Sequence, residues 1–333
     1  MKTVHTKRHF LSLAAVTALA IAAASPAVVS AQGAYPNKPI RVVVPFPPGG
    51  AIDTFARSIS QELQVQLGQP IVVINKPGGG SQIAAGEVLG SPADGYTIFL
   101  AQTGDFSVNP HLYKNINYIP ARDFDGIGMF VRAPQVMLAN NTGKVNSVST
   151  LKNELSRQGS GVMYGSFGPG TAPHLLGHIL GNSTPGAKVT HVPYKGFPPA
   201  MQAIMTKEID LLFDAVPGTL NMTRSGKIVP LAIADAHRSS HLPNVPTTAE
   251  IGYPNLVMEF WIGAAVKKGT PRAIVNRLNE VFIKAVATPE IAKRFEDLGY
   301  SRVTMSADQF DAYVAAESLR MKPLIQEAGV VAE

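Results

Sequence analysis

The stretch IRVVVPFPPGGAID, residues 40–53, joins a short apolar run to a glycine-containing loop and then to the beginning of a helix. The β-branched residues within 40–44 favour a strand. Gly49 and Gly50 let the backbone approach a ligand without an intervening Cβ atom. The helix that follows, which we expect to begin near Asp53, offers free N–H groups and the positive end of its dipole to an anion. The stretch therefore predicts a βα unit whose loop is suited to binding an anion.

Short apolar runs and helix-like stretches keep alternating along the rest of the chain. Further strands are predicted at residues 71–74, 96–100, 161–164, 188–192, 211–214 and 230–234. Helices are predicted from Gln82, through 174–180, over 271–287 and over 307–317, and the last two are expected to pack on the first lobe. Such alternation is typical of parallel α/β sheets. A chain of 333 residues with 45% hydrophobic residues favours two lobes over one.

The amino terminus has the pattern of a secretory signal peptide. Three basic residues precede an apolar run at residues 10–24, and small residues end at Ala31, where a signal peptidase is expected to cut. The alternative is a membrane anchor, which needs about 20 apolar residues. The run is shorter than that and is followed by Pro26. We therefore predict that residues 1–31 are a signal peptide and that the mature protein is exported.

The net charge and the cysteine content indicate which partners and which cellular compartment to expect. The predicted signal peptide carries three of the 29 Lys and Arg residues and none of the 23 acidic ones, so its removal lowers the formal net charge from +6 to +3. This charge is too small, and the basic residues too scattered, to indicate nucleic-acid binding. The absence of cysteine excludes disulfides, thiolate metal sites and a cysteine nucleophile. In an exported protein it indicates a Gram-negative periplasm.

A second glycine turn has the same design as the first. Gly165, Gly168 and Gly170 lie between a predicted strand and a predicted helix, together with the hydroxyl groups of Ser166 and Thr171. Two such turns on two lobes would hold a small carboxylate from both sides through main-chain N–H groups and hydroxyl groups. A βα loop can also be glycine-rich only because it turns tightly, and that alternative remains open for each turn.

Two side chains of the first loop have alternative roles. Asp53, in the first turn of its helix, is expected to cap that helix, and it can also contact the bound solute or the waters around it. Phe46 is either a wall of the pocket or the apolar plug beneath it.

The common catalytic motifs are not matched. Tyr164 stands where a nucleophile elbow around Ser166 requires glycine. His174 and His178 have a spacing that can bind a metal, but no glutamate follows the first histidine and no third ligand is evident nearby. The glycine loop at residues 78–80 is not followed by the acid of a dinucleotide-binding site, and a Walker lysine is absent. We predict no catalytic residues, no metal and no cofactor.

Many short blocks of the chain, in order, resemble the substrate-binding proteins of tripartite tricarboxylate transporters, of the Bug type. The resemblance extends over essentially the whole mature chain. The blocks are residues 35–40 (YPNKPI), 44–50 (VPFPPGG), 75–78 (NKPG), 92–97 (PADGYT), 109–113 (NPHLY), 165–170 with 174–175, 192–196 (VPYKG), 242–247 (LPNVPT) and 269–271.

The resemblance implies an α/β, two-lobed periplasmic binding protein of the type II-like Venus flytrap class, in which each lobe is a mixed sheet flanked by helices. It implies a first lobe of residues 35–138 and 257–333, and a second lobe of residues 139–256. The expected ligand is a small organic carboxylate, the expected partner is an inner-membrane permease, and the expected state is a monomer. The residues that it implies for ligand binding are Phe46, Gly50, Ala51, Asp53, Thr103, Gly104, Ser166, Gly168, Thr171, His174 and Asp214.

The chain departs from the family pattern at Ala51-Ile52, where relatives usually have proline and a small hydroxyl residue. The change predicts a less polar wall. It therefore favours a mono- or dicarboxylate with an aromatic or medium-chain aliphatic body over citrate or an amino acid. Two alternatives to a transport receptor remain on the same scaffold: a periplasmic ligand sensor for signalling, and a hydrolase that processes a carboxylate.

Overall fold

The computed structural model describes residues 35–327, and the chain from Lys38 onward forms one compact unit. The predicted signal peptide, residues 1–31, lies outside the described residues. The architecture is α/β, as predicted. Its strands form a 10-stranded arrangement in the order β2-β1-β3-β9-β4-β7-β5-β6, with β8 and β10 also paired to β4.

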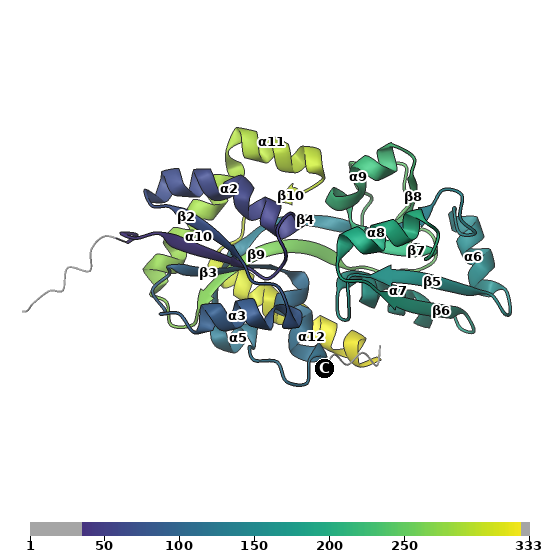
Figure 1. Cartoon of the computed structure of the whole chain (residues 1–333), viewed down its shortest axis with the longest axis horizontal. Coiled ribbons are helices and arrows are strands. Elements are labelled where there is room, and N and C mark those ends of the chain that lie inside the picture. Colours follow the sequence, from purple (N-terminus) through teal and green to yellow (C-terminus); the bar gives the residue numbers. More distant parts are fainter. Residues whose placement is uncertain (1–34, 328–333) are drawn as a thin grey trace, which may run out of the picture. The chain divides into compact units, whose positions relative to one another are not determined.

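The first part of the sheet is built from the βα units expected at the amino terminus. Strands β1 (Ile40–Val44), β2 (Ile71–Asn75) and β3 (Thr97–Gln102) are parallel, with β1 between the other two. Strand β9 (Glu259–Lys267) returns from much later in the chain and pairs antiparallel with β3. Figure 1 shows β9 between β3 and the long strand β4.

Strand β4 (Phe124–Asn140) joins the two parts of the sheet. Its first half pairs with β9, as far as Pro134 opposite Glu259, and its second half pairs with β7 and β8 from Gln135 onward. The second part contains parallel strands β5 (Gly161–Ser166), β6 (Lys188–Pro193) and β7 (Leu211–Ala215). Strand β8 (Ile228–Ala234) is antiparallel to β4, as is the short β10 (Ser301–Arg302). The predicted lobe boundary at residues 138 and 139 falls inside β4.

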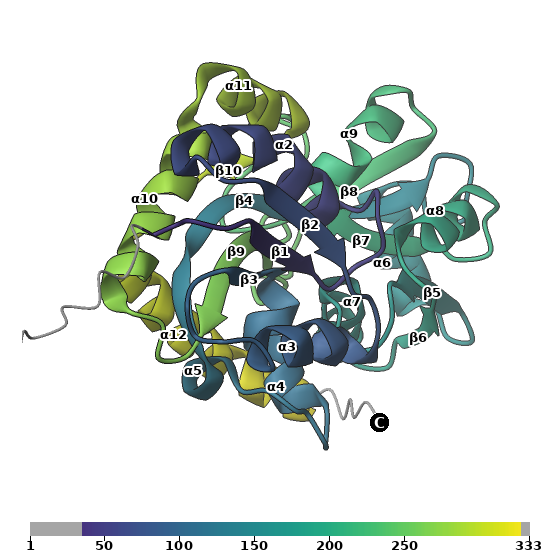
Figure 2. The ribbon, with the colours of Figure 1, turned by 60° about the vertical axis from the view of Figure 1, so that its left-hand side comes forward.

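Helices cover both faces of the sheet. Figure 2 shows α2, α10 and α11 on one face of the first part and α3, α5 and α12 on the other. The helices are α2 (Ala51–Leu67), α3 (Gln82–Leu89), α4 (Asn109–Leu112), α5 (Pro120–Asp123), α6 (Val148–Ser156), α7 (Ala172–Asn182), α8 (Phe197–Met205), α9 (Val216–Arg224), α10 (Arg272–Ala287), α11 (Pro289–Leu298) and α12 (Ala307–Glu327), with short turns η1 (Gly79–Ser81) and η2 (Gly104–Val108). None of the helices described between residues 35 and 327 combines the length and hydropathy needed to span a membrane.

An aromatic cluster forms the core of the first part. Phe106 stacks on Trp261 with ring centroids 5.6 Å apart and meets the edge of Phe310 at the same distance. Phe99 stacks on Phe124 at 5.3 Å. These side chains come from β3, η2, β4, β9 and α12, so the core ties late segments of the chain to early ones.

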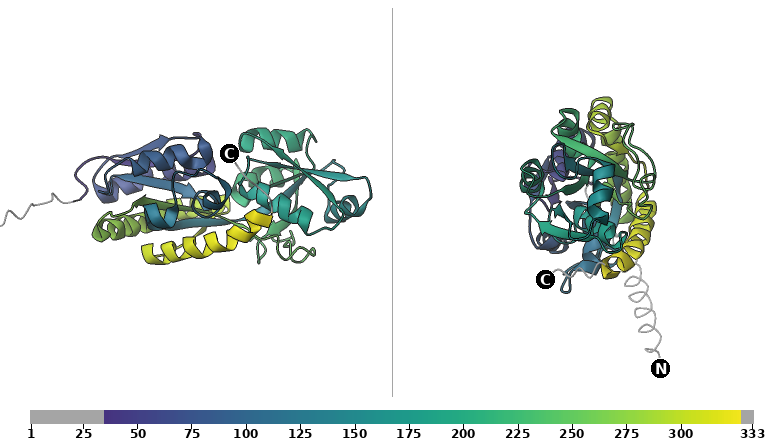
Figure 3. Two further views of the ribbon diagram at one scale, coloured as in Figure 1. Left: turned by 90° about the horizontal axis from the view of Figure 1, so that it is seen from below. Right: turned by 90° about the vertical axis from the view of Figure 1, so that its right-hand side faces the viewer.

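Helix α12 extends further than the predicted 307–317. Its carboxyl-terminal half continues beneath the second part of the sheet, as seen in Figure 3. There Met321 and Ile325 are buried in a cluster with Leu175 and Met137. Helix α10 packs on α2 and β4, in agreement with the prediction for its segment.

Gly177 allows α7 to approach β5 closely. A Cβ atom at this position would lie 2.1 Å from the Tyr164 ring. Replacing glycine by alanine inside a helix ordinarily stabilises a protein by about 0.5–1 kcal/mol. We expect Gly177→Ala instead to destabilise by about 1–3 kcal/mol, because the ring must move.

Gly86 provides a matched control in α3, because its nearest neighbour would lie 3.5 Å from the new Cβ atom. We expect Gly86→Ala to stabilise the protein, as measured by urea unfolding of both variants. If Gly177→Ala instead stabilised the protein, the close contact between Gly177 and the Tyr164 ring would be contradicted.

Candidate ligand-binding site

The topology turns the carboxyl ends of the two sets of parallel strands toward each other. At the end of β3, Gln102 pairs with Ile262 of β9, which is opposite Val131 of β4. At the end of β7, Ala215 is opposite Gln135 of β4. β7 is antiparallel to β4, whereas β3 runs in the same direction as β4 because each is antiparallel to β9. Four residues of extended strand measure about 13 Å. The two edges that carry the predicted site therefore face each other across about this distance.

The first loop, residues 45–50, leads from β1 into α2. Gly50 is the N-cap residue, in an extended conformation, and both Gly50 and Ala51 are exposed. The amide groups of the first helical turn have no acceptor within the helix, so they are available to an anion. Phe46 beside them is partly buried.

Asp53 holds this loop in shape. Its side chain is 2% exposed, and its carboxylate accepts hydrogen bonds from Gly49 N at 2.9 Å, from Asn75 Nδ2 at 2.9 Å and from Arg57 Nε at 3.0 Å. Asn75 Nδ2 also donates to the carbonyl oxygen of Phe46 at 3.0 Å. Burial raises the pKa of the Asp53 carboxyl, but the hydrogen bonds from Arg57, Gly49 and Asn75 outweigh it, so the pKa lies below the ordinary value of 3.8. Asp53 is thus an ionised group that supports the loop from beneath.

Thr103 and Gly104 follow β3, where the π-helical turn η2 begins. The Thr103 hydroxyl donates to the carbonyl oxygen of Glu259 and accepts from Trp261 N, both at 3.0 Å, so it joins β3 to β9. Gly104 is partly exposed, with open space where a Cβ atom would project. Of these two neighbours, Gly104 is the one that a ligand can approach.

The second turn, residues 166–171, leads from β5 into α7 and is held by its own hydroxyl groups. Ser166 Oγ accepts a hydrogen bond from Gly168 N at 3.1 Å, and Thr171 Oγ1 donates to Gly168 O at 2.7 Å. Ser166 is fully buried, whereas Gly168 and Thr171 are partly exposed. Gly170 has a φ of +76° and lies against Leu112 of α4, which would leave only 1.8 Å to a Cβ atom. This contact joins the second turn to an element that follows β3.

Two histidines lie beneath the second turn. His174 Nδ1 accepts a hydrogen bond from Gly170 N at 3.0 Å, and His191 Nε2 lies 2.6 Å from Ser166 Oγ. His174 is only 7% exposed. Burial lowers the pKa of His174 to about 4, assisted by the neighbouring His191 and His178.

Asp214 is the second-last residue of β7, on the same edge as Ser166, and is partly exposed. Burial raises the pKa of its carboxyl to about 7, and the adjacent Ala215 N–H lowers it only in part. Tyr300, which follows α11, lies near Asp214. Burial raises the pKa of the Tyr300 hydroxyl, and the charge of Asp214 raises it further. The two acids of the predicted site therefore have opposite environments, since Asp53 is kept ionised and Asp214 is readily neutralised.

The predicted residues fall into two groups. Phe46, Gly50, Ala51, Gly104, Gly168, Thr171 and Asp214 are at least partly exposed at the facing edges. Asp53, Thr103, Ser166 and His174 are buried, with hydrogen bonds inside the protein. The sequence did not indicate Arg57, Asn75, His191 or Tyr300, because each reaches the site from an element distant in the chain or along a helix. The Asn-Lys-Pro-Gly block that contains Asn75 was the only available signal for any of them.

The argument from Ile52 is corrected by its position. Its side chain is 3% exposed and belongs to the interior. The expected apolar wall therefore does not come from Ile52. Apolar surface near the second turn comes instead from Phe167, which meets Phe197 of α8 edge-on at 6.0 Å.

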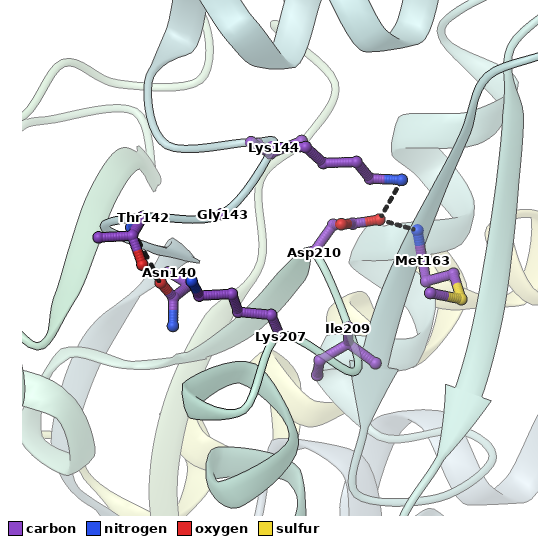
Figure 4. A pocket seen from close by; sticks show the side chains of 9 residues that line it. Asn140, Thr142, Gly143, Lys144, Met163, Lys207, Ile209 and Asp210 are labelled. Atoms are coloured by element: carbon purple, nitrogen blue, oxygen red, sulfur yellow. Dashed lines mark hydrogen bonds and ion pairs between the residues drawn. The ribbon is translucent and has the colours of Figure 1, made fainter.

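A separate pocket opens at the other end of the second part of the sheet. None of the predicted ligand-binding residues lines it; its lining is Asn140, Thr142, Gly143, Lys144, Val145, Met163, Lys207, Ile209 and Asp210. Figure 4 shows Lys144 directed at Asp210, with Nζ 3.0 Å from the carboxylate. This ion pair satisfies one of the two lysines of the pocket.

Comparison with known proteins gives one consistent family. The model of the tripartite tricarboxylate transporter family receptor matches residues 55–330. The protein BugT of Bordetella pertussis is 33% identical over 318 residues, which cover 95% of this chain and 97% of BugT.

Solved structures agree in fold. The periplasmic binding protein BugD is 33% identical with a TM-score of 0.81, over 90% of this chain and all of BugD. A Rhodopseudomonas palustris protein solved with adipate is 30% identical with a TM-score of 0.82, over 89% of this chain and 99% of its own. Another from the same organism, solved with bound malate, is 27% identical with a TM-score of 0.79, over 87% of this chain and all of its own. The predicted two-lobed fold is confirmed.

The ionised Asp53 makes the stability of the first loop testable. We expect Asp53→Asn to lower the free energy of unfolding by about 1–3 kcal/mol at neutral pH, because an amide nitrogen would then face the donors that surround this site. A carboxyl with a lowered pKa stabilises the folded state above its ordinary pKa, and this contribution is lost as the pH falls through the lower folded value. The difference between variant and wild type, measured by urea unfolding, should therefore shrink below about pH 4.

Glu62→Gln is the control, since Glu62 of the same helix bonds only to Gln66 along the surface. It should change stability by less than about 0.5 kcal/mol. Equal effects of the two substitutions would contradict the supporting role of Asp53.

Proposed function

We propose a ligand class for this chain, which belongs to the tripartite tricarboxylate transporter receptor family. The family predicted from the sequence is confirmed, and the chain is a solute-binding receptor of a transport system. The proposed ligand is a small dicarboxylate with an apolar aliphatic or aromatic body. The proposed site is formed by the loop at residues 45–50, Gly104, the turn at 166–171 and Asp214.

The observation that carries the proposal is the pair of helix N-termini on facing edges. Helix α2 begins after the exposed Gly50, and α7 begins after the partly exposed Thr171. Each supplies amide groups and the positive end of a helix dipole. Two such ends at opposite sides of a site suit a ligand with an acidic group at each end.

The side chains near the two helix N-termini support a ligand with an apolar body. Phe46 of the first loop is partly exposed, and so are Phe167 of the second turn and Phe197, which contacts it. Asp214 is the acid on this edge, and it disfavours a third carboxylate when it is ionised because like charges repel. The relatives solved with adipate and with malate hold dicarboxylates, which supports two acidic groups in the ligand, and adipate has an apolar body.

The cellular location, the oligomeric state and the partner are proposed from membership of the receptor family. A periplasmic location follows from the family of periplasmic binding proteins, and we propose that residues 1–31 direct export as a signal peptide. The receptor would act as a monomer and deliver its ligand to an inner-membrane permease. A signalling partner instead of a permease would use the same binding step.

Calorimetry against adipate and citrate tests the ligand class. We expect saturable binding of adipate, a rise in melting temperature, and no turnover after prolonged incubation. At 100 times Kd a ligand stabilises by about 2.7 kcal/mol, which a thermal shift detects readily. Citrate bound without adipate would overturn the ligand class, and a stable product from adipate would favour the hydrolase.

Two glycine substitutions test the location of the site. Gly50 has φ −75° and no atom closer than 3.6 Å to a new Cβ, and Gly104 has none within 4 Å. We expect Gly50→Leu and Gly104→Leu to fold normally and to weaken adipate binding by about 100-fold, or about 2.8 kcal/mol, by filling the site. Gly86→Leu on the surface of α3 is the matched control and should leave binding unchanged.

A further inference from the structure

The second turn rests on a stack of three rings from three different elements. His174 of α7 and His191 of β6 are parallel within 11°, with ring centroids 4.0 Å apart. Tyr164 of β5 also stacks on His191, with ring centroids 5.1 Å apart. The Tyr164 hydroxyl donates to the carbonyl oxygen of His174 at 3.2 Å, which ties the first turn of α7 to β5. The stack therefore joins the strand and the helix that flank the turn.

Each imidazole holds one end of the turn. His174 Nδ1 accepts from Gly170 N at 3.0 Å, near the beginning of α7. His191 Nε2 meets Ser166 Oγ at 2.6 Å, at the end of β5. Ser166 Oγ in turn accepts from Gly168 N, so the middle of the turn depends on the same contact. A side chain at position 170 could not hold the turn in place, because Leu112 already occupies the space that its Cβ atom would need.

We propose that His174 and His191 are positioning residues, an imidazole pair that holds the Ser166–Thr171 turn in its ligand-binding shape, and that the turn is released when His174 takes up a proton at Nδ1. This inference rests on the proposed function, because the turn is one half of the proposed site. It differs from a direct ligand contact by His174, which is nearly inaccessible.

The hydrogen bond of His174 requires the neutral state of its ring. His174 Nδ1 accepts from an amide, so it carries no proton, and the ring proton is on Nε2. Protonation of Nδ1 would place one N–H against another and break this bond. Two imidazolium rings stacked at 4.0 Å would also repel each other.

The surroundings favour the same state. The titratable groups that face the pair are Tyr164 from β5 and His178, one turn along α7. His178 Nε2 is itself bonded to Asn182 at 2.8 Å. Burial lowers the pKa of His174 to about 4, and it also lowers that of His191. The turn is therefore preformed at neutral pH and is released as the pH falls toward 4.

The test uses variants that keep the accepting atoms but cannot titrate. Asparagine places an oxygen near the position of His Nδ1, and glutamine places a polar atom near that of His Nε2. The double variant His174→Asn/His191→Gln should bind adipate at neutral pH within about threefold of wild type, equivalent to less than 1 kcal/mol. His174→Leu, which lacks the acceptor, should bind adipate about tenfold more weakly than the double variant at every pH.

The ratio of wild-type to double-variant affinity is the decisive quantity, because the titration of adipate and of Asp214 cancels in it. We expect the ratio to fall by about tenfold between pH 7 and pH 3, because the pKa of His174 is about 4 and one proton must then leave its ring before adipate binds. A ratio that stays constant over this range overturns the proposal, whether or not the single variants weaken binding.

Nuclear magnetic resonance of the ligand-free protein separates this inference from the proposed function. The Gly170 amide signal should shift with the titration of the His174 ring and should be insensitive to pH in the double variant. If no acid binds at all, the proposed function fails while this titration still decides the role of the pair. A Gly170 amide that ignores the protonation of His174 would overturn it.

Discussion

Strand β4 is the constraint on which the arrangement of the site depends. Because it pairs with β9 along its first half and with β7 and β8 along its second, it fixes the directions of two sets of strands with one continuous backbone. The carboxyl ends of β3 and β7 are then turned toward each other, with Val131 and Gln135 marking them on β4. We propose that a ligand between these edges meets main-chain groups from both sides.

The two turns at these edges are supported by different chemistry. The first loop rests on an ionised carboxylate, Asp53, that accepts bonds from Gly49, Arg57 and Asn75. The second rests on the imidazoles of His174, which is buried, and His191, which is partly buried. In both cases the side chain beneath the turn uses its polar atoms within the protein, which leaves the exposed amide groups for the ligand. Preorganisation of this kind lowers the ordering cost of binding.

Local patterns predicted the βα units and both glycine turns, since the strand at residues 40–44 and its loop depend on neighbours in the chain. Strand β4 was not predicted, because register shifts near Gly126 and Met129 interrupt its alternation of side chains. The part played by His191 could not be predicted either. It depends on the packing of β6 against β5 and α7, and sequence spacing does not encode that contact. The sequence also placed Ile52 at a wall of the site, whereas its side chain is buried. Which face of a helix packs inward depends on the elements around it, and the local pattern at residues 51–52 does not show that face.

Amide hydrogen exchange with and without adipate is the most direct measurement of the central claim, that main-chain groups of both turns hold the ligand together. The account predicts that amides at residues 50–54 and at residues 168–172 gain protection in the same titration, with the same apparent affinity. Protection confined to one turn, or to the pocket around Lys144 and Asp210, would contradict it.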